Sequence, residues 1–211
     1  MTITTTKTLL RRQRPAKATT MMATLLLLGA CGTTPPSNFY TLNTVTDTTT
    51  GSAASRCEGL SVGVGPIIFP EYLQRPNIVT RVSPNKLAID EFNRWGGSLQ
   101  EDFERVFRMQ LASVLSNKNI FPHPNNEDMA VDYRVSATVH QLDGRFGDSA
   151  RLSGEWSLIN TATRSVIITD HISLTEPLPG NDYEQLAAVY SRLVINFSNT
   201  VAAELSKHCG N

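Results

Sequence analysis

Ser61 is the residue whose surroundings most suggest a catalytic nucleophile. Residues 59–63 match the G-x-S-x-G pattern of serine hydrolases. That pattern is active where a strand turns sharply at the serine and a helix follows. Apolar residues alternate with small ones from Leu60 to Pro66, which predicts a strand that continues through the serine. A serine hydrolase using Ser61 therefore remains only a remote alternative.

Other side chains that could do chemistry are scattered along the chain. His123, His140, His171 and His208 have no further metal-binding side chain at ligand spacing on a shared face. The adjacent acidic pairs at 90–91 and 101–102 are typical of solvated faces and helix N-termini, not of general acid–base pairs. The sequence therefore predicts a protein that is not an enzyme and has no metal or cofactor.

The 211 residues are 40% hydrophobic and 18% charged, a composition typical of a globular domain. The first 30 residues contain five basic side chains and no acidic one, which leaves residues 31–211 with a net charge of −5. Because nucleic-acid binding requires a basic surface, this acidic remainder argues against a nucleic-acid partner.

Residues 1–30 have the layout of an export signal. A basic segment precedes the short apolar run 21–28, and small residues follow. Leu28-Gly29-Ala30-Cys31 resembles the lipobox of bacterial lipoproteins, which implies cleavage before Cys31 and acylation of Cys31. Gly32 follows, where an Asp would favour retention in the inner membrane. We therefore expect a lipid anchor in the outer membrane, facing the periplasm.

Residues 31–58 are predicted to be the lipidated cysteine and a flexible tether, because Thr, Ser, Pro and Asn dominate them. Phe39-Tyr40-Thr41-Leu42 is the exception. These four residues form either a short edge strand docked on the domain or a mobile apolar segment, and the sequence does not separate the two.

Residues 59–211 are predicted to form one α+β domain. Alternating apolar residues indicate strands, most clearly over 131–139, and a capping box at Ser98 precedes an amphipathic helix that reaches about Ser116. A second helix is expected after Asn181. The expected architecture is one mixed, largely antiparallel sheet covered by two helices.

Cys57 precedes the first strand of this domain, and Cys209 lies near its last residue. In the oxidising periplasm two remaining cysteines usually pair, and a bridge closing so long a loop stabilises by about 5 kcal/mol in the chain-entropy model. Two free thiols are the alternative.

The mature chain resembles the PqiC (YmbA) family, the auxiliary lipoproteins of ABC-type and MCE lipid-transport systems. The similarity rests on the lipobox, on Phe39-Tyr40-Thr41-Leu42 and on Val64-Gly65-Pro66. It also rests on Arg94-Trp95 and on the distinctive stretch Pro70-Glu71-Tyr72-Leu73-Gln74-Arg75-Pro76-Asn77-Ile78-Val79-Thr80-Arg81. The family's usual Ala-Glu-Pro after the Trp is Gly96-Gly97-Ser98 here.

The resemblance implies a non-catalytic outer-membrane component that docks a periplasm-spanning MCE tunnel protein and supports membrane integrity. It further implies an inner-membrane Pqi-type partner, lipid cargo and a homo-oligomeric ring. Aromatic, aliphatic and Arg residues in loops are candidate partner contacts. They are Tyr72, Leu73, Arg75, Pro76 and Trp95, although Tyr72 and Trp95 would equally suit covering the ends of the sheet.

A periplasmic lipid carrier is the alternative function. Such a carrier would hold an acyl chain in its own apolar pocket between helix and sheet. A filled core with apolar surface would instead favour a protein partner.

Overall fold

A computed structural model of the chain describes residues 2, 35–44, 57, 59–124 and 130–209. The chain divides into two units after Pro36, and the fold below is that of Ser37–Asn211. The predicted signal peptide and the predicted lipidation site Cys31 lie outside the described residues. In the part of the chain that is described, no helix has both the length and the apolar character needed to cross a bilayer.

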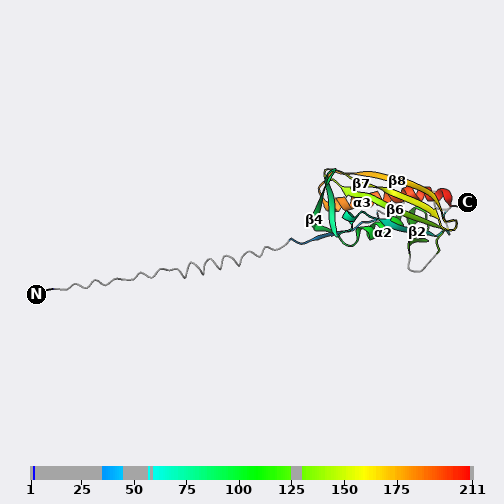
Figure 1. The fold of residues 1–211 in the computed structure, drawn as a ribbon, viewed down its shortest axis with the longest axis horizontal. Helices are drawn as coiled ribbons and strands as arrows, with labels where there is room; N and C mark the ends of the chain where they lie inside the picture. The colour runs from blue at the N-terminus through cyan, green and yellow to red at the C-terminus, as the bar shows by residue number, and fades with distance from the viewer. Residues whose placement is uncertain (1, 3–34, 45–56, 58, 125–129, 210–211) are drawn as a thin grey trace. The chain divides into compact units, whose positions relative to one another are not determined.

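The described residues of this unit form two α-helices and eight strands (Figure 1). The strands are β1 (Asn38–Tyr40), β2 (Val62–Ile68), β3 (Asn77–Ser83), β4 (Lys86–Trp95), β5 (Ile120–Pro122), β6 (Tyr133–Gly144), β7 (Asp148–Asn160) and β8 (Ser165–Leu178). The helices are α2 (Leu99–Val114) and α3 (Tyr183–His208), with the short 3-10 helix η2 (Glu71–Leu73).

A five-stranded sheet in the order β5-β2-β6-β7-β8 is the main layer. Its β2 pairs in parallel with β5 and β6, whereas β6, β7 and β8 pair antiparallel. The period-two pattern explains its two faces: Val135, Ala137 and Val139 are buried, and the residues between them are more exposed. Gly154 lies opposite a register shift in β6, where a Cβ would meet the carbonyl oxygen of Thr138.

A second sheet contains three strands in the order β1-β4-β3. Here β3 and β4 form an antiparallel hairpin, and β1 adds in parallel, with Tyr40 opposite Trp95. The segment around Phe39 therefore docks as an edge strand, one of the two arrangements that the sequence left open. Because of this docking, the folded unit begins before residue 59, the expected start of the domain.

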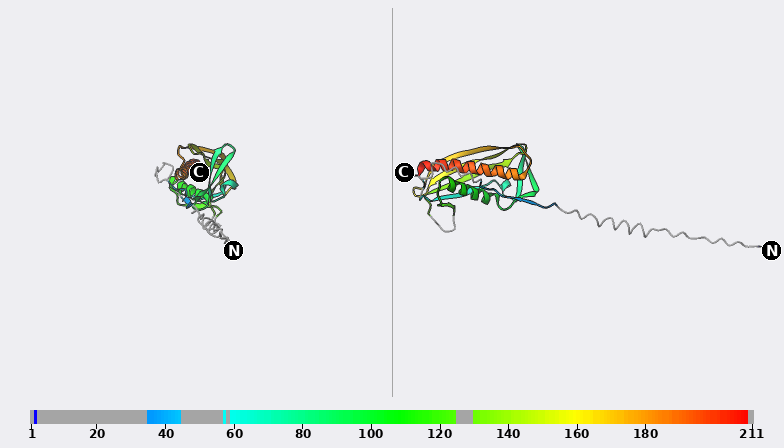
Figure 2. Two further views of the ribbon diagram at one scale, coloured as in Figure 1. Left: turned by 90° about the vertical axis from the view of Figure 1, so that its left-hand side faces the viewer. Right: turned by 180° about the vertical axis from the view of Figure 1, so that it is seen from behind.

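Both helices pack on one face of the five-stranded sheet (Figure 2). Between them and the sheet lies a cluster of buried rings, from Phe103 and Phe107 in α2, Phe197 in α3 and Trp156 in β7. Their centroids are 5.0–6.4 Å apart, distances at which aromatic pairs add to the stability gained by burial. This cluster fills the layer between helices and sheet.

The helix starts follow from capping side chains. The Ser98 hydroxyl accepts a hydrogen bond from the backbone N–H of Glu101 at 3.4 Å, as the capping box predicts. The second helix is capped by Asp182, whose carboxylate accepts from Glu184 N–H, one residue after the expected Asn181. Asp and Asn are both strong N-caps, so residue type alone does not choose between adjacent positions.

The predicted α+β class, with mixed sheet pairing and two covering helices, is confirmed. The strands are divided between two sheets, whereas one sheet was expected. The division depends on which strands pair, and β1 lies more than 50 residues before its partner β4. Periodicity along the chain carries no information on such a pairing.

Candidate functional site

The loop Pro70–Pro76 carries most of the predicted contact residues. The turn η2 holds its shape, with Leu73 N–H donating to the Pro70 carbonyl and Gln74 N–H to that of Glu71, both at 3.0 Å. Trp95 N–H donates to the Pro76 carbonyl at 2.7 Å and ties the end of the loop to β4. This backbone presents successive side chains in different directions.

Arg75 and Pro76 are exposed on this loop, beside a surface hollow of about 330 Å³. The opposite wall is the start of α2, with Ser98 and Leu99, and the buried Leu73 forms part of the lining. The hollow thus combines an apolar lining with the positive charge of Arg75. No acidic side chain of the described residues forms an ion pair with Arg75. We call this feature the loop–helix hollow.

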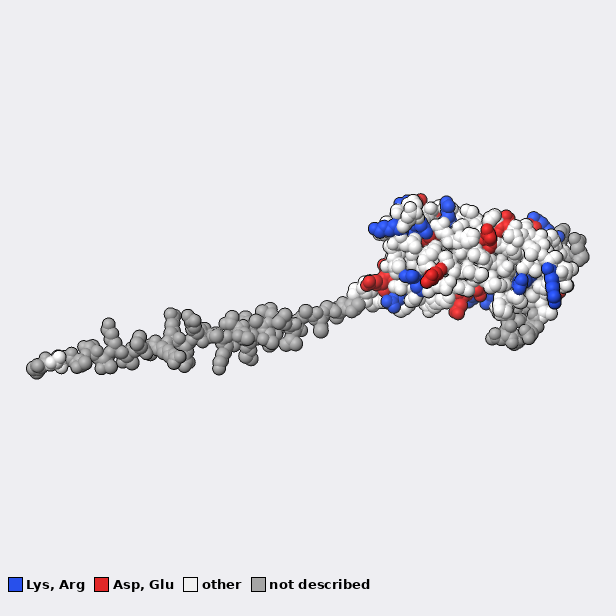
Figure 3. Space-filling view, viewed as in Figure 1, with Lys and Arg blue, Asp and Glu red and all other residues white. Residues whose placement is uncertain are grey.

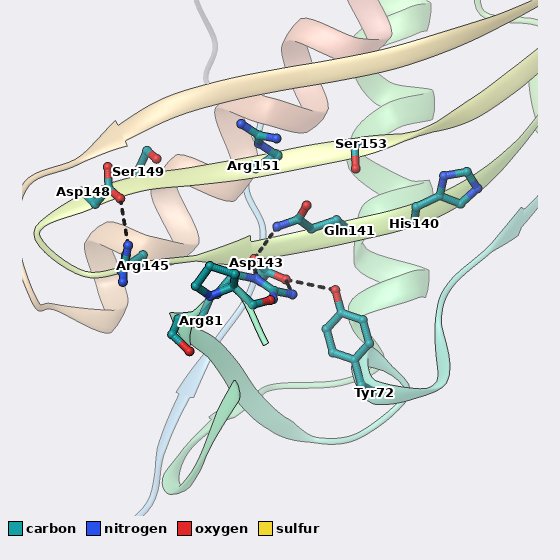
Figure 4. Close-up of a pocket in the computed structure, with 12 residues that line it drawn as sticks. Tyr72, Arg81, His140, Gln141, Asp143, Arg145, Asp148, Ser149, Arg151 and Ser153 are labelled. Carbon is teal, nitrogen blue, oxygen red and sulfur yellow. Dashed lines mark hydrogen bonds and ion pairs between the residues drawn. The ribbon is translucent and has the colours of Figure 1, made fainter. Parts of the chain in front are cut away.

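Tyr72 points away from that hollow, toward the face of the five-stranded sheet (Figure 4). Its hydroxyl donates a hydrogen bond to Asp143 Oδ2 at 3.1 Å. Burial and the negative charge of Asp143 raise the pKa of Tyr72 to about 12. The phenol therefore stays protonated at neutral pH and acts as a donor inside the fold.

Asp143 collects donors from three separate elements, although it is only 2% exposed. Arg81 on β3 donates through Nε to Oδ1 at 2.8 Å and through Nη2 to Oδ2 at 2.6 Å. Gln141 Nε2 adds a third bond at 2.8 Å, and Tyr72 the fourth. We call Tyr72, Arg81, Gln141 and Asp143 the carboxylate clamp. It joins β3 and η2 to β6, and it satisfies a charge that would be costly to bury alone.

Trp95 lies in the core, where its side chain is 4% exposed. Its ring stacks on Tyr190 of α3, with centroids 5.9 Å apart and planes inclined by 30°. Of the two roles considered for Trp95, the structure supports covering the end of the sheet, because so little of the ring reaches the surface. The five predicted contact residues are thus not gathered on one face. Arg75 and Pro76 are exposed, Leu73 lines the hollow from below, and Tyr72 and Trp95 face inward.

Ser61 does not have the geometry of a hydrolase nucleophile. It immediately precedes β2, so no helix follows the serine. Its hydroxyl donates to Asp132 Oδ2 at 2.8 Å, and within the described residues it makes no hydrogen bond with a histidine. Nor do the described residues bring three His, Cys, Asp or Glu side chains together as a metal site.

Cys57 and Cys209 meet at the far end of α3, where the structure joins them by a disulfide with Cα atoms 5.0 Å apart. This separation lies within the range that disulfides span. The bridge holds the residue that precedes the domain's first long strand against the C-terminal helix.

Sequence reasoning missed the role of Asp143 and Arg81. Arg81 closes the distinctive stretch that begins at Pro70, but Asp143 belongs to no motif in the sequence. A carboxylate at the end of a half-buried strand was the available signal, because a buried charge requires partners.

Several solved structures have the same arrangement of sheets and helices as this α+β domain. One, described only as an uncharacterized protein, has 19% identity and a TM-score of 0.66. Another, a DUF330 protein from Xanthomonas campestris, has 12% identity and a TM-score of 0.64. Each match covers 81% of this chain and 99% of the other. At these identities the likeness shows the fold alone.

The family model of the ABC-type transport auxiliary lipoprotein component matches residues 40–202, and the chain belongs to that family. The resemblance to PqiC/YmbA-type lipoproteins is thereby confirmed, and the protein is a transport-associated lipoprotein. The comparison with curated proteins found no match.

Proposed function

We propose that this lipoprotein is a non-catalytic component of a Pqi-type MCE system that moves lipids between membranes. In this proposal Cys31 is acylated and holds the domain on the periplasmic face of the outer membrane. The domain docks a periplasm-spanning MCE protein, acts with an inner-membrane Pqi-type partner and supports membrane integrity. A ring of several copies is part of the proposal, following the family resemblance.

The loop–helix hollow is the observation that carries the docking part of this proposal. An exposed Arg and Pro stand beside apolar lining from Leu73 and Leu99. Interfaces are typically anchored by Arg and apolar side chains that enter or border pockets. The backbone bonds of η2 hold the loop in place, so docking here would require little ordering of the loop.

The filled core supports a protein partner over the lipid-carrier alternative. The space between helices and sheet is occupied by the aromatic cluster of Phe103, Phe107, Trp156 and Phe197. An acyl chain could enter there only by displacing rings that are at most 2% exposed. Apolar side chains do reach the surface elsewhere, for example Phe39 at 66% and Ile89 at 51% exposed.

An affinity capture of the mature lipoprotein from solubilised cell envelopes tests the proposal. We expect wild type to retain an MCE-domain protein and Arg75→Ala to lose most of it. The matched control is Lys118→Ala, which removes another exposed positive charge. Lys118 follows the C-terminal end of α2, whereas Arg75 faces its N-terminal end, some 24 Å away along a 16-residue helix.

Two results would contradict the proposal in different ways. Equal capture by wild type, Arg75→Ala and Lys118→Ala would remove the loop–helix hollow from the docking surface. Wild type that retains no MCE protein but co-purifies with stoichiometric phospholipid would reject docking and favour a lipid-binding role instead.

A further inference from the structure

A polar groove of about 490 Å³ lies where the β3–β4 hairpin crosses the exposed face of β6 and β7 (Figure 4). The carboxylate clamp forms its floor. Its walls carry Arg145 and Arg151, with the hydroxyls of Ser149 and Ser153 between and beside them. The volume lies within the range of small-ligand sites.

Asp143, on the floor of the groove, is already fully paired and needs no further cation. Asp143 accepts four hydrogen bonds, two from Arg81 and one each from Tyr72 and Gln141. An ionised carboxylate offers about four acceptor sites, so these donors occupy all of them. The negative charge of Asp143 is balanced by Arg81 and does not need the arginines of the walls.

Arg151 is a further cation of the groove, and it does not take part in balancing Asp143. It stands opposite Asp143 in the β6–β7 register, is exposed, and makes no hydrogen bond or ion pair with the described residues. Arg145 donates to the Val82 carbonyl at 2.9 Å and lies 3.7 Å from Asp148. The groove therefore has three arginines against two aspartates, a net positive charge of one with His140 neutral.

Hydroxyl donors flank this cation on the same strand face. Ser149 and Ser153 lie two residues before and after Arg151, so their side chains point to the same side of β7. Among the described residues neither hydroxyl has a hydrogen-bond partner. A planar guanidinium with hydroxyl donors beside it is the usual protein surrounding of a phosphate oxygen.

We propose that this groove binds a phosphate group, with Arg151 and Ser153 as its ligands. The groove is distinct from the loop–helix hollow, whose lining comes from the Pro70–Pro76 loop and the start of α2.

The position of the groove indicates an anionic phospholipid headgroup as the source of that phosphate. The β6–β7 turn packs Phe146 on Tyr183, with ring centroids 5.1 Å apart, and Tyr183 lies 6.2 Å from Tyr40 of β1. The groove and the entry of the chain thus share one end of the domain, where Figure 3 shows Lys and Arg atoms interspersed with Asp and Glu atoms. Cys31 precedes β1 by seven residues, a span of at most about 25 Å. The choice of a membrane source rests on the proposed acylation of Cys31.

Calorimetric titration of the mature lipoprotein in neutral detergent tests this inference. The probes are dihexanoyl phosphatidylglycerol, dihexanoylglycerol without the phosphate, and inorganic phosphate. We expect saturable binding of phosphatidylglycerol, no binding of dihexanoylglycerol, and weakening by about tenfold or more in Arg151→Ala, since a hydrogen bond to a charged group is lost. Ser153→Ala should weaken binding less, and Lys118→Ala should leave it unchanged.

Binding of inorganic phosphate as tightly as phosphatidylglycerol would support the phosphate site and overturn its membrane source. Equal binding of phosphatidylglycerol by wild type and Arg151→Ala, or binding of neither phosphate compound by wild type, would overturn the site. Thermal unfolding of each variant verifies that it is folded. If the protein binds lipid in an Arg151-dependent manner but captures no MCE protein, only the proposed function is rejected. If it captures an MCE protein but shows no Arg151-dependent lipid binding, only this inference is rejected.

Discussion

Arg81 Nη2 lies 2.6 Å from Asp143 Oδ2 and joins the three-stranded sheet to the five-stranded sheet. The two residues are 62 positions apart in the sequence. Asp143 is buried at 2% exposure, whereas the Arg81 side chain keeps 25%. The pair therefore holds the β3–β4 hairpin on the sheet and shapes both the polar groove and the position of the loop before β3.

Removing Arg81 should destabilise the fold more than removing both partners. Arg81→Ala leaves a buried carboxylate without its cation, which typically costs about 3–5 kcal/mol in the free energy of unfolding. The double variant Arg81→Ala, Asp143→Ala removes the buried charge as well and should recover part of this loss. Urea denaturation measures both. A loss below about 1 kcal/mol in Arg81→Ala would show that the clamp does not hold the sheets together.

Alkaline pH should weaken the fold through Tyr72. Burial and the charge of Asp143 raise its pKa to about 12, against about 10 in an unfolded chain. The folded state thus holds the phenol proton more tightly, so the stabilisation is complete below pH 10 and is lost as pH rises from 10 through 12. Urea denaturation at several alkaline pH values should show a shallower loss in Tyr72→Phe than in wild type. Identical slopes would contradict this role, since Tyr183 titrates alike in both proteins.

Substitutions of Trp95 and Arg75 should have different effects: we expect Trp95 to contribute to stability and Arg75 to docking. Trp95→Ala removes a ring that stacks on Tyr190 and should lower the free energy of unfolding by about 3–5 kcal/mol. Arg75 is exposed, and Arg75→Ala should change stability by no more than about 0.5 kcal/mol. Thermal and urea unfolding provide the comparison. The folded variant Trp95→Phe should still capture the MCE partner, and its failure to do so would return Trp95 to the docking surface.

The bridge between Cys57 and Cys209 should form on export and stabilise the domain. It closes a sequence separation of 152 residues, so the chain-entropy model gives a stabilisation of about 5 kcal/mol, at the upper end of the observed range. Peptide mapping without reductant should find the two cysteines linked, and reductant should lower the melting temperature. The variant with both cysteines replaced by Ser is the control, because reductant should not change it. Maleimide labelling of both thiols in intact periplasm would contradict the pairing.

Cys31 should carry the membrane anchor. Cells fed an alkyne analogue of palmitate should label the wild-type protein, and Cys31→Ser should abolish the label. Sucrose-gradient fractionation should place wild type in the outer membrane and move Gly32→Asp toward the inner membrane. If the wild-type protein carries no label, the lipid anchor is removed from the proposal. If the wild-type protein fractionates with the inner membrane, the predicted location is wrong.

Local signals were sufficient for most of the secondary structure. The capping box at Ser98 located the start of α2, and the alternation over 131–139 located β6. The start of α3 differed by one residue because two adjacent cap residues compete. These features depend on neighbours within a few positions, which a single sequence contains in full.

The candidate site was only partly predictable. The stretch from Pro70 to Arg81 stood out, and residue type suggested contact roles for Tyr72 and Arg75. Only the direction of each side chain separates the two: Tyr72 donates to Asp143, 71 residues away, and Arg75 faces outward. That direction depends on the turn η2 and on what packs against it, which no local pattern specifies.

The sequence by itself determined the α+β class and the family and predicted an export signal and a lipobox, because each depends on patterns of residue types along the chain. Only the tertiary structure decided the division into two sheets, the clamp around Asp143, the burial of Trp95 and the separation of the loop–helix hollow from the polar groove. The physical reason is that these features consist of contacts between distant segments. A buried charge or ring is stable only where its partners meet it, and those partners are chosen by the packing of the whole domain.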